Sequence, residues 1–375
     1  MNRPSFGKRI AAVAAVLALC LSIGMTGCAA EETESVDPTI DISDTSGGIA
    51  ATVNGEEIGE NAVTAYIQHF REVQGLEDDE AWGQYLFDYA YTVDSFRGDT
   101  LTYFENRVLL RQAAEQQGVS VTQEELEEAL ATAIEEQGGE DAWKESLENT
   151  GLSVAAYREQ MELSLLSAKL ENAVTENVTG TDEEVLSSVK MYVEAYPGAK
   201  RSTQLLFDVG DEELAQEVLD KINSGELSFE DAVAQYSLDQ EDEGDVGWDK
   251  LAEFEDEYQA ALDDLEVGEM SGLVKSDTGI RIIMCTDELV LPEEGITSLD
   301  QVSDSFVEFV RSQIDESAKR QAWEKWFEDF KYASDIHEEY LPEGAVYWVD
   351  LTPYEDAARE AAQQVQDERE AQEGE

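Results

Sequence analysis

The segment 298–333 constrains the fold of this chain more than any other part of the sequence. Large apolar side chains recur along it at helical spacing and form one broad face. They are Val302, Phe306, Phe309, Val310, Ile314, Trp323, Trp326, Phe327 and Phe330. A helix with so much aromatic area must bury that face against another element. Because the only unmatched apolar helices lie before residue 195, we expect this segment to pack back onto them, which makes the intervening residues an insert.

The part of the chain before this insert is predicted to be helical. Apolar residues recur at three- and four-residue spacing in 100–117. Thr122 and Glu125 have the spacing of a capping box, which begins the next helix. The sequence therefore predicts a mostly helical domain over 49–196, which the segment 293–345 completes.

The pattern changes near Pro197. A strand-like run, STQLLF, is followed by two short helices, an acidic loop, a short helix around 253–262 and a final strand, GIRIIMC. This β-α-α-α-β order over 199–288 is typical of a compact α+β unit. The predicted fold class is therefore α+β, a mostly helical domain into which this smaller domain is inserted.

The stretch 239–250, DQEDEGDVGWDK, begins with the acidic spacing of a calcium-binding loop. Its twelfth position should supply a bidentate carboxylate but holds Lys250, and its third and fifth positions hold Glu instead of Asp or Asn. We therefore expect no metal site here, and the sequence indicates no cofactor. A protein that buffers cations at the cell surface is the weakest alternative.

The charge of the chain restricts its partners. There are 24 Lys and Arg against 86 Asp and Glu, a formal net charge of -62. Such a surface would repel phosphates, so we expect no nucleic acid as a partner. The acidity favours solubility and says nothing about the fold. A high-salt habitat could select the same composition.

The N-terminus predicts an exported, lipid-anchored protein. Basic residues precede an apolar run, Ile10–Met25, that is shorter than the roughly 20 residues needed to span a bilayer. The run ends in MTGC, which resembles the bacterial lipobox, in which the cysteine is diacylated and becomes the mature N-terminus. The sequence thus predicts a signal peptide over 1–27, a lipid on Cys28, and an extracytoplasmic location at the bacterial cell membrane. An ordinary secretory signal with a chance cysteine is the alternative.

Two further segments are predicted to lie outside the folded domains. Residues 28–48 are acidic and rich in Ser and Thr, which predicts a disordered tether, and residues 354–375 form an acidic tail. Cys285 lies in a strand pattern and is predicted to be a buried, inert thiol. Because Cys20 would leave with the signal peptide and Cys28 would carry lipid, no internal disulfide is expected.

Residues 199–288 resemble the parvulin-type peptidyl-prolyl cis-trans isomerases, above all in GDVGW and GEMSG, which occur in that order. The flanking segments resemble the helical chaperone domain of the extracytoplasmic foldases of PrsA and SurA type. The stretches that carry this second resemblance are VNGEEI, NRVLLRQAAEQQGVSVTQEELEEAL, GLSVAAYREQMELSLL and AWEKWFEDFKYASDI. Together the two resemblances cover most of the chain from 49 to 340. They imply a chaperone that binds unfolded or proline-containing secreted polypeptides, and they allow a homodimer.

The resemblance also implies the residues of the site. A pocket for the proline ring corresponds to Phe254, Tyr258 and Leu262, for which ordinary packing of a helix face is the alternative. In the polar centre, the family has His, then Asp or Cys, then Ser or Thr, then a second His. The residues that stand there in this chain, as expected catalytic residues, are Gln204, Asp239, Thr278 and Arg281.

Both family histidines are therefore replaced, and the chain's own two, His69 and His337, lie outside this unit. An arginine stays charged and cannot accept a hydrogen bond. We expect Arg281 to pair with Asp239, or else to turn outward to solvent.

An enzyme that rotates an X–Pro bond breaks no bond, although the barrier is roughly 18–20 kcal/mol. It needs a dry pocket for the ring and polar groups that favour the twisted amide. Loss of both histidines predicts weak or absent isomerase activity. The predicted function is a membrane-anchored foldase with a parvulin domain of reduced activity, and the alternative is a non-catalytic holdase or scaffold whose parvulin domain is inert.

Overall fold

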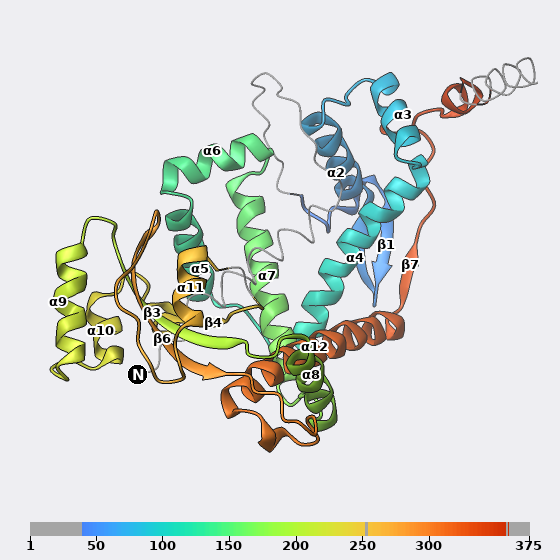
Figure 1. Cartoon of the computed structure of the whole chain (residues 1–375). Helices are drawn as coiled ribbons and strands as arrows, with labels where there is room; N and C mark the ends of the chain where they lie inside the picture. Colours follow the sequence, from blue (N-terminus) through green and yellow to red (C-terminus); the bar gives the residue numbers. More distant parts are fainter. Residues whose placement is uncertain (1–39, 252–253, 358, 360–375) are drawn as a thin grey trace, which may run out of the picture. The chain divides into compact units, whose positions relative to one another are not determined.

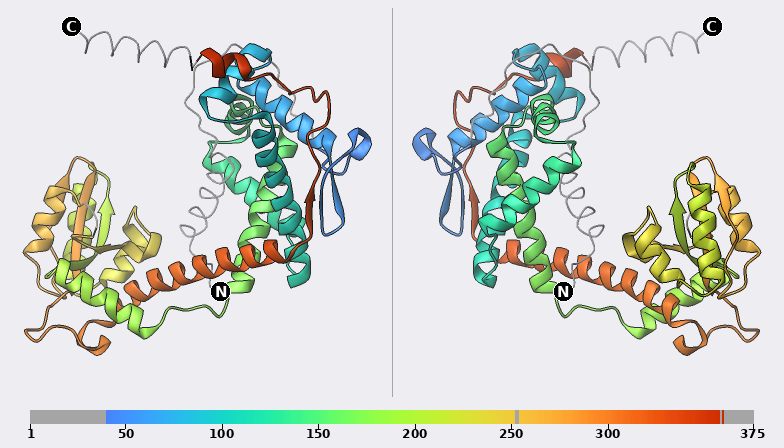
Figure 2. Two further views of the ribbon diagram at one scale, coloured as in Figure 1. Left: turned by 90° about the vertical axis from the view of Figure 1, so that its right-hand side faces the viewer. Right: turned by 90° about the vertical axis from the view of Figure 1, so that its left-hand side faces the viewer.

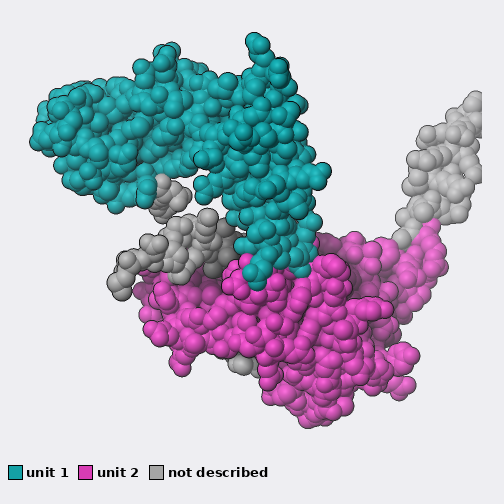
Figure 3. Space-filling model, turned by 90° about the horizontal axis from the view of Figure 1, so that it is seen from below, with its two compact units in different colours: residues 1–19, 177–322 teal, residues 20–176, 323–375 magenta. Residues whose placement is uncertain are grey.

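The computed structural model describes residues 40–251, 254–357 and 359 (Figure 1). Contacts divide the described residues into two units, one of residues 177–322 and one of residues 40–176 and those from 323 onward (Figure 3). The predicted signal peptide, Cys28 and most of the acidic tail lie outside the described residues. None of the described helices is both long enough and apolar enough to cross a bilayer.

The unit that contains residues 40–176 and the residues from 323 onward is called the helical unit below. Its elements are η1 Thr45–Gly47, β1 Ile49–Val53, β2 Glu56–Gly59, α2 Glu60–Val73, α3 Asp79–Asp88, α4 Val93–Gln117, α5 Gln123–Glu136, α6 Glu140–Thr150, α7 Val154–Thr175 and β7 Ile336–Glu338. The three strands form an antiparallel sheet in the order β2-β1-β7. The predicted capping box is confirmed, because the Thr122 side chain accepts from the Glu125 amide and the Glu125 carboxylate accepts from the Thr122 amide.

Residues 40–48 are ordered, which corrects the prediction that the disordered tether extends to residue 48. Ile40 and Ile42 pack against the core of the helical unit, and the Gly59 N–H donates to the Ile42 carbonyl at 2.8 Å. The reason is apolar area: two isoleucines in this acidic segment gain free energy when they leave water.

Helix α12, Asp304–Ala333, is continuous, but its two halves belong to different units (Figure 2). Phe306 and Val310 in the first half pack against buried valines of α8, Asp182–Ala195. Trp323, Trp326 and Phe330 in the second half pack against alanines of α4 and leucines of α7. The prediction that this segment packs onto helices from before residue 195 is therefore confirmed.

The unit of residues 177–322 is called the α+β unit. Besides α8 and the first half of α12 it contains β3 Lys200–Phe207, α9 Glu212–Asn223, α10 Phe229–Tyr236, η2 Glu241–Gly244, β4 Asp245–Trp248, α11 Asp256–Asp263, β5 Val274–Ser276, β6 Gly279–Glu288 and η3 Leu299–Gln301. Contacts thus group α8 with this unit, whereas the sequence placed it in the domain 49–196, and the exact domain boundaries stay a prediction.

The α+β unit is built around an antiparallel sheet in the order β4-β3-β6-β5. Helices α9 and α10 cover one face, where Leu205 and Ile282 are buried, and α11 covers the other, where Ile283 and Cys285 are buried (Figure 1). The sequence predicted β3, β6 and the three helices in the right order but missed the edge strands β4 and β5. Burial raises the pKa of the Cys285 thiol, as expected for an inert cysteine.

Candidate functional site

Two central strands present polar side chains on the face of the sheet that α11 covers. Gln204 lies on β3 and Arg281 on β6, and the two strands are paired so that Gln204 is opposite Ile283 and Leu206 is opposite Arg281. Since side chains two residues apart point to the same face of a strand, Gln204 and Arg281 emerge diagonally from each other on one face. Gln204 is almost fully buried, and the Arg281 side chain is 13% exposed.

The four expected polar residues are brought together in one hydrogen-bond network. The Arg281 Nε donates to the Gln204 side-chain oxygen at 3.1 Å, and the Gln204 side-chain nitrogen donates to Asp239 Oδ2 at 2.8 Å. On its other side, Arg281 Nη2 donates to Thr278 Oγ1 at 2.9 Å. The network therefore contains Gln204, Asp239, Thr278 and Arg281, and their catalytic role stays a prediction.

The carboxylate that pairs with Arg281 is Glu255, which corrects the expected pairing with Asp239. Arg281 Nη1 lies 3.1 Å from Glu255 Oε2. The physical reason is the intervening glutamine, because the Gln204 amide accepts from the arginine and donates to Asp239, so that it separates the two charges.

Glu255 and Ser276 are members of the network that sequence reasoning missed. The Glu255 carboxylate accepts from Thr278 Oγ1 at 2.7 Å, and Ser276 Oγ accepts from Arg281 Nη1 at 2.9 Å. The hydrogen bond from Thr278, followed by that from Ser276 and by the charge of Arg281, lowers the pKa of Glu255. One signal was present in the sequence: Glu255 directly follows Phe254, an expected pocket residue, at the start of α11.

The three expected proline-pocket residues differ in their exposure. Leu262 is completely buried and Tyr258 is 4% exposed, whereas Phe254 is half-buried at the edge of the same cluster. The rings of Phe254 and Tyr258 meet edge to face with centroids 4.9 Å apart. The Tyr258 hydroxyl lies 2.9 Å from Ser202 Oγ, and burial raises its pKa to about 12. Tyr258 and Leu262 thus support Phe254 from the core, and a role in proline binding stays a prediction for all three.

The acidic loop uses carboxylates for internal contacts. Asp239 accepts from Gln204, and Asp245, on β4, forms an ion pair with Arg201 at 2.6 Å. Within the described ranges, no three His, Cys, Asp or Glu side chains converge in a way that could hold a metal ion.

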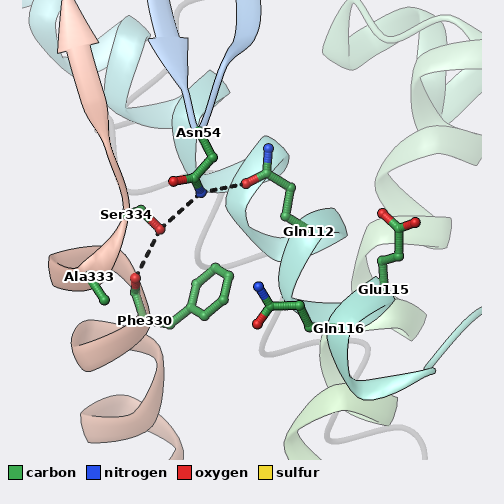
Figure 4. Close-up of a pocket in the computed structure, with 7 residues that line it drawn as sticks. All are labelled: Asn54, Gln112, Glu115, Gln116, Phe330, Ala333 and Ser334. Atoms are coloured by element: carbon green, nitrogen blue, oxygen red, sulfur yellow. Dashed lines mark hydrogen bonds between the residues drawn. The ribbon is translucent and has the colours of Figure 1, made fainter.

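A separate cavity of about 470 Å³ lies in the helical unit, between the β1–β2 turn, α4 and the end of α12 (Figure 4). Its lining residues are Asn54, Gln112, Glu115, Gln116, Phe330, Ala333 and Ser334. The Asn54 side-chain nitrogen donates to Gln112 Oε1 at 2.7 Å and to Ser334 Oγ at 3.1 Å, which ties the three elements together. The lining thus combines amide side chains with one aromatic ring.

Comparison with known proteins gives two family matches. The model of the PPIC-type PPIase domain matches residues 209–287, and the model of the SurA-like N-terminal domain matches residues 5–171. The first match falls within the α+β unit and includes Asp239, Glu255, Thr278 and Arg281 of the polar network, whereas Gln204 lies just before it.

Several curated proteins are similar over larger parts of the chain. The foldase protein PrsA of Halalkalibacterium halodurans is 33% identical over 193 residues, which are 48% of this chain and 55% of that protein. The PrsA of Geobacillus kaustophilus is 30% identical over 213 residues, 56% of this chain and 69% of that protein. The chaperone SurA of Pectobacterium atrosepticum is 27% identical over 256 residues, 64% of this chain and 57% of that protein.

Among solved structures, that of PrsA from Bacillus subtilis is 20% identical with a TM-score of 0.44, and the match covers 78% of this chain and 93% of that one. The chain spans little more than half the length of the Halalkalibacterium relative and about two thirds of the Geobacillus relative. With a PPIC-type domain, a SurA-like N-terminal domain and 30% identity to one foldase over most of that protein's length, this chain belongs to the PrsA and SurA family of foldase chaperones.

Proposed function

We propose that this chain is an extracytoplasmic foldase, tethered to the membrane by a lipid on Cys28, that binds unfolded secreted polypeptides and isomerises their prolyl bonds only weakly. Its relatives are named foldases and chaperones, which supports the binding of unfolded chains. The lipobox-like MTGC supports the tether.

The observation that carries the proposal of weak catalysis is that Arg281 uses all its donors within the polar network of the α+β unit. A twisted prolyl amide gains most from donors that are free to follow its shifting charge. Here the five N–H donors of Arg281 are held by Gln204, Glu255, Ser276 and Thr278, and the Gln204 side-chain nitrogen donates to Asp239. An active site with this arrangement retains the hydrophobic support of Tyr258 and Leu262 but offers few donors to the substrate.

A second candidate, the non-catalytic holdase, is favoured by features of the helical unit. Three of its aromatic side chains are strongly exposed: Tyr332 is 93% exposed, Tyr340 95% and Trp348 56%. With the cavity beside Phe330 they offer aromatic surface to an unfolded chain, for which no isomerisation is needed.

Two assays on the full mature chain separate the candidates. Exchange spectroscopy by NMR on a proline-containing peptide measures isomerisation without a coupled protease, and light scattering of an aggregating reduced protein measures holding. A weak foldase accelerates exchange and suppresses aggregation, whereas a holdase only suppresses aggregation. A chain that does neither would refute the proposal.

A further inference from the structure

Arg281 uses its hydrogen-bonding capacity entirely within the protein. An arginine side chain has five N–H donors in a fixed planar fork. Nε binds Gln204, Nη1 binds Glu255 and Ser276, and Nη2 binds Thr278 and, at 3.5 Å, the second oxygen of Glu255. These five contacts match the five donors. A ligand that needs a donor from Arg281 must therefore displace one of these partners.

Glu255 is the partner that a ligand could imitate. Among the described residues it is the one carboxylate paired with Arg281, its side chain is 36% exposed, and it directly follows the half-buried Phe254 in the chain. The lowered pKa of Glu255 keeps this carboxylate ionised at neutral pH. A client's acidic side chain that approached Arg281 would therefore compete with Glu255 for the same guanidinium.

The groups left for a client are acceptors. Asp239 is half-buried, and within the described part of the chain only its Oδ2 accepts from a side-chain donor, Gln204. Lys275, which precedes Ser276, is already paired with Glu212, and Arg201 at the other end of β3 is paired with Asp245. The chain as a whole carries a net charge of -62. Cationic side chains are therefore attracted to this network, and anionic ones are repelled.

We propose that Glu255 determines the selectivity of this site: it excludes client segments with Asp or Glu beside the proline and favours segments with Lys or Arg there. The inference rests on the proposed function, since it assumes that the site receives prolyl segments. Its physical basis is competition and repulsion together, because an acidic client must displace Glu255 from Arg281 while it faces Asp239.

The test uses three peptides, Ala-Xaa-Pro-Phe with Xaa as Lys, Ala or Glu, and the full mature chain. NMR exchange gives kcat/KM for each peptide, and titration of the same peptides gives their Kd. For the wild type we expect kcat/KM to decrease in the order Lys, Ala, Glu. The Lys peptide should exceed the Glu peptide by at least about fivefold, which corresponds to an interaction of about 1 kcal/mol.

Two matched variants each remove one negative charge at the start of α11. Glu255 is the N-cap of this helix, and Glu257 lies in its first turn. Glu255→Gln keeps an acceptor for Thr278 but loses the charge that competes for Arg281. We therefore expect the kcat/KM of the Glu peptide, divided by that of the Lys peptide, to rise by about fivefold. Glu257→Gln is the control, because Glu257 is exposed and makes no side-chain bond within the described residues. It should shift the ratio by less than about twofold.

The outcomes distinguish the inference from the proposed function. Peptides that react or bind with an unchanged ratio in Glu255→Gln, or equally well with Lys and Glu in the wild type, overturn the selectivity and leave the foldase proposal intact. The wild-type ranking needs no variant, so equal values for the Lys and Glu peptides overturn the inference even if Glu255→Gln fails to fold. If the wild type neither binds nor isomerises any of the three peptides, both proposals fail at this site.

Discussion

At the scale of single residues, the polar centre of the α+β unit differs from its sequence-based description in one partner. Gln204, Asp239, Thr278 and Arg281 could be placed from the resemblance, and the structure brings them together. The carboxylate that pairs with Arg281 could not be predicted, because the pairing depends on whether the Gln204 amide lies between Arg281 and Asp239. Sequence gives the residue types on a strand face but not the distances between side-chain ends.

Restoring the family residues at two positions tests the proposal that the replaced histidines weaken catalysis. The double variant Gln204→His and Arg281→His should raise kcat/KM for a prolyl peptide by about tenfold or more, since a pair of neutral imidazoles can donate and accept where the arginine is locked. Exchange spectroscopy measures it. The control is Arg201→His, on the same strand but paired with Asp245 outside the network, which should give no gain. If the double variant is no faster, the lost histidines are not the cause.

Glu105 gives a prediction about pH at the same scale. It is 2% exposed on α4, one of its oxygens lacks a hydrogen bond within the described residues, and burial raises its pKa, with Glu338 adding to the rise and Lys331 opposing it. A carboxyl whose pKa is raised by folding stabilises the protein below its unfolded pKa, near 4.3, and loses this contribution as pH rises through the folded value.

Glu105→Gln should therefore stabilise the protein at pH 7 by about 1 kcal/mol and flatten the fall of Tm between pH 4.5 and pH 7. Thermal unfolding followed by circular dichroism at several pH values measures this. Glu115→Gln, an exposed change on the same helix, is the control and should shift the free energy of unfolding by less than about 0.5 kcal/mol. A variant with the pH profile of the wild type would contradict the prediction.

At the scale of elements, the long helices were predictable and the short edge strands were not. Apolar periodicity predicts the helices of 100–117 and 298–333, and the capping box of Thr122 and Glu125 predicts a helix start. Strands β4 and β7 have four and three residues, too few for an alternating pattern. They form because strands distant in sequence supply hydrogen-bond partners. β4 pairs with β3, and β7 pairs with β1, which lies near the other end of the described sequence.

A buried ion pair fixes the segment after β7 to the helices of the helical unit. Arg97 and Glu60 are paired at 2.6 Å, the Tyr347 hydroxyl donates to Glu60 at 2.7 Å, and Arg97 also donates to the Glu339 carbonyl. Tyr347 is completely buried. A buried carboxylate is costly unless donors satisfy it, and Tyr347 supplies one of the donors to Glu60. This hydrogen bond therefore holds the C-terminal segment in place.

Tyr347→Phe should consequently lower the free energy of unfolding by about 2 kcal/mol, as expected for a buried hydrogen bond to a charged group. Urea denaturation followed by intrinsic fluorescence measures the change. Tyr340→Phe removes the same hydroxyl from a side chain that is 95% exposed and should change the stability by less than about 0.5 kcal/mol. Equal effects of the two variants would show that the buried triad does not stabilise this segment.

At the scale of the whole molecule, one feature of the sequence predicted that a domain is inserted between helical segments. The aromatic face of 298–333 required partners from before residue 195, and Phe306 and Trp326 have them, on α8 and on the α4–α7 pair. What the sequence could not settle is where one unit ends, because α12 serves both and its face shows no break at Ala322. An inserted domain with helical segments on either side is confirmed, and its borders depend on contacts that no local pattern encodes.

The membrane tether is the prediction that places the whole molecule in the cell. If the MTGC stretch is a lipobox, Cys28→Ala prevents diacylation, and the protein should move from the membrane fraction and the detergent phase of a Triton X-114 partition into the aqueous phase. Cys20→Ala is the matched control, because it changes the same residue type within the apolar run and leaves Cys28 intact, so it should stay with the membrane. A single acyl chain binds membranes only marginally, whereas two chains anchor stably, so the fraction lost should be most of the protein. A Cys28→Ala protein that remains in the detergent phase would mean that something other than a lipid on Cys28 retains it there.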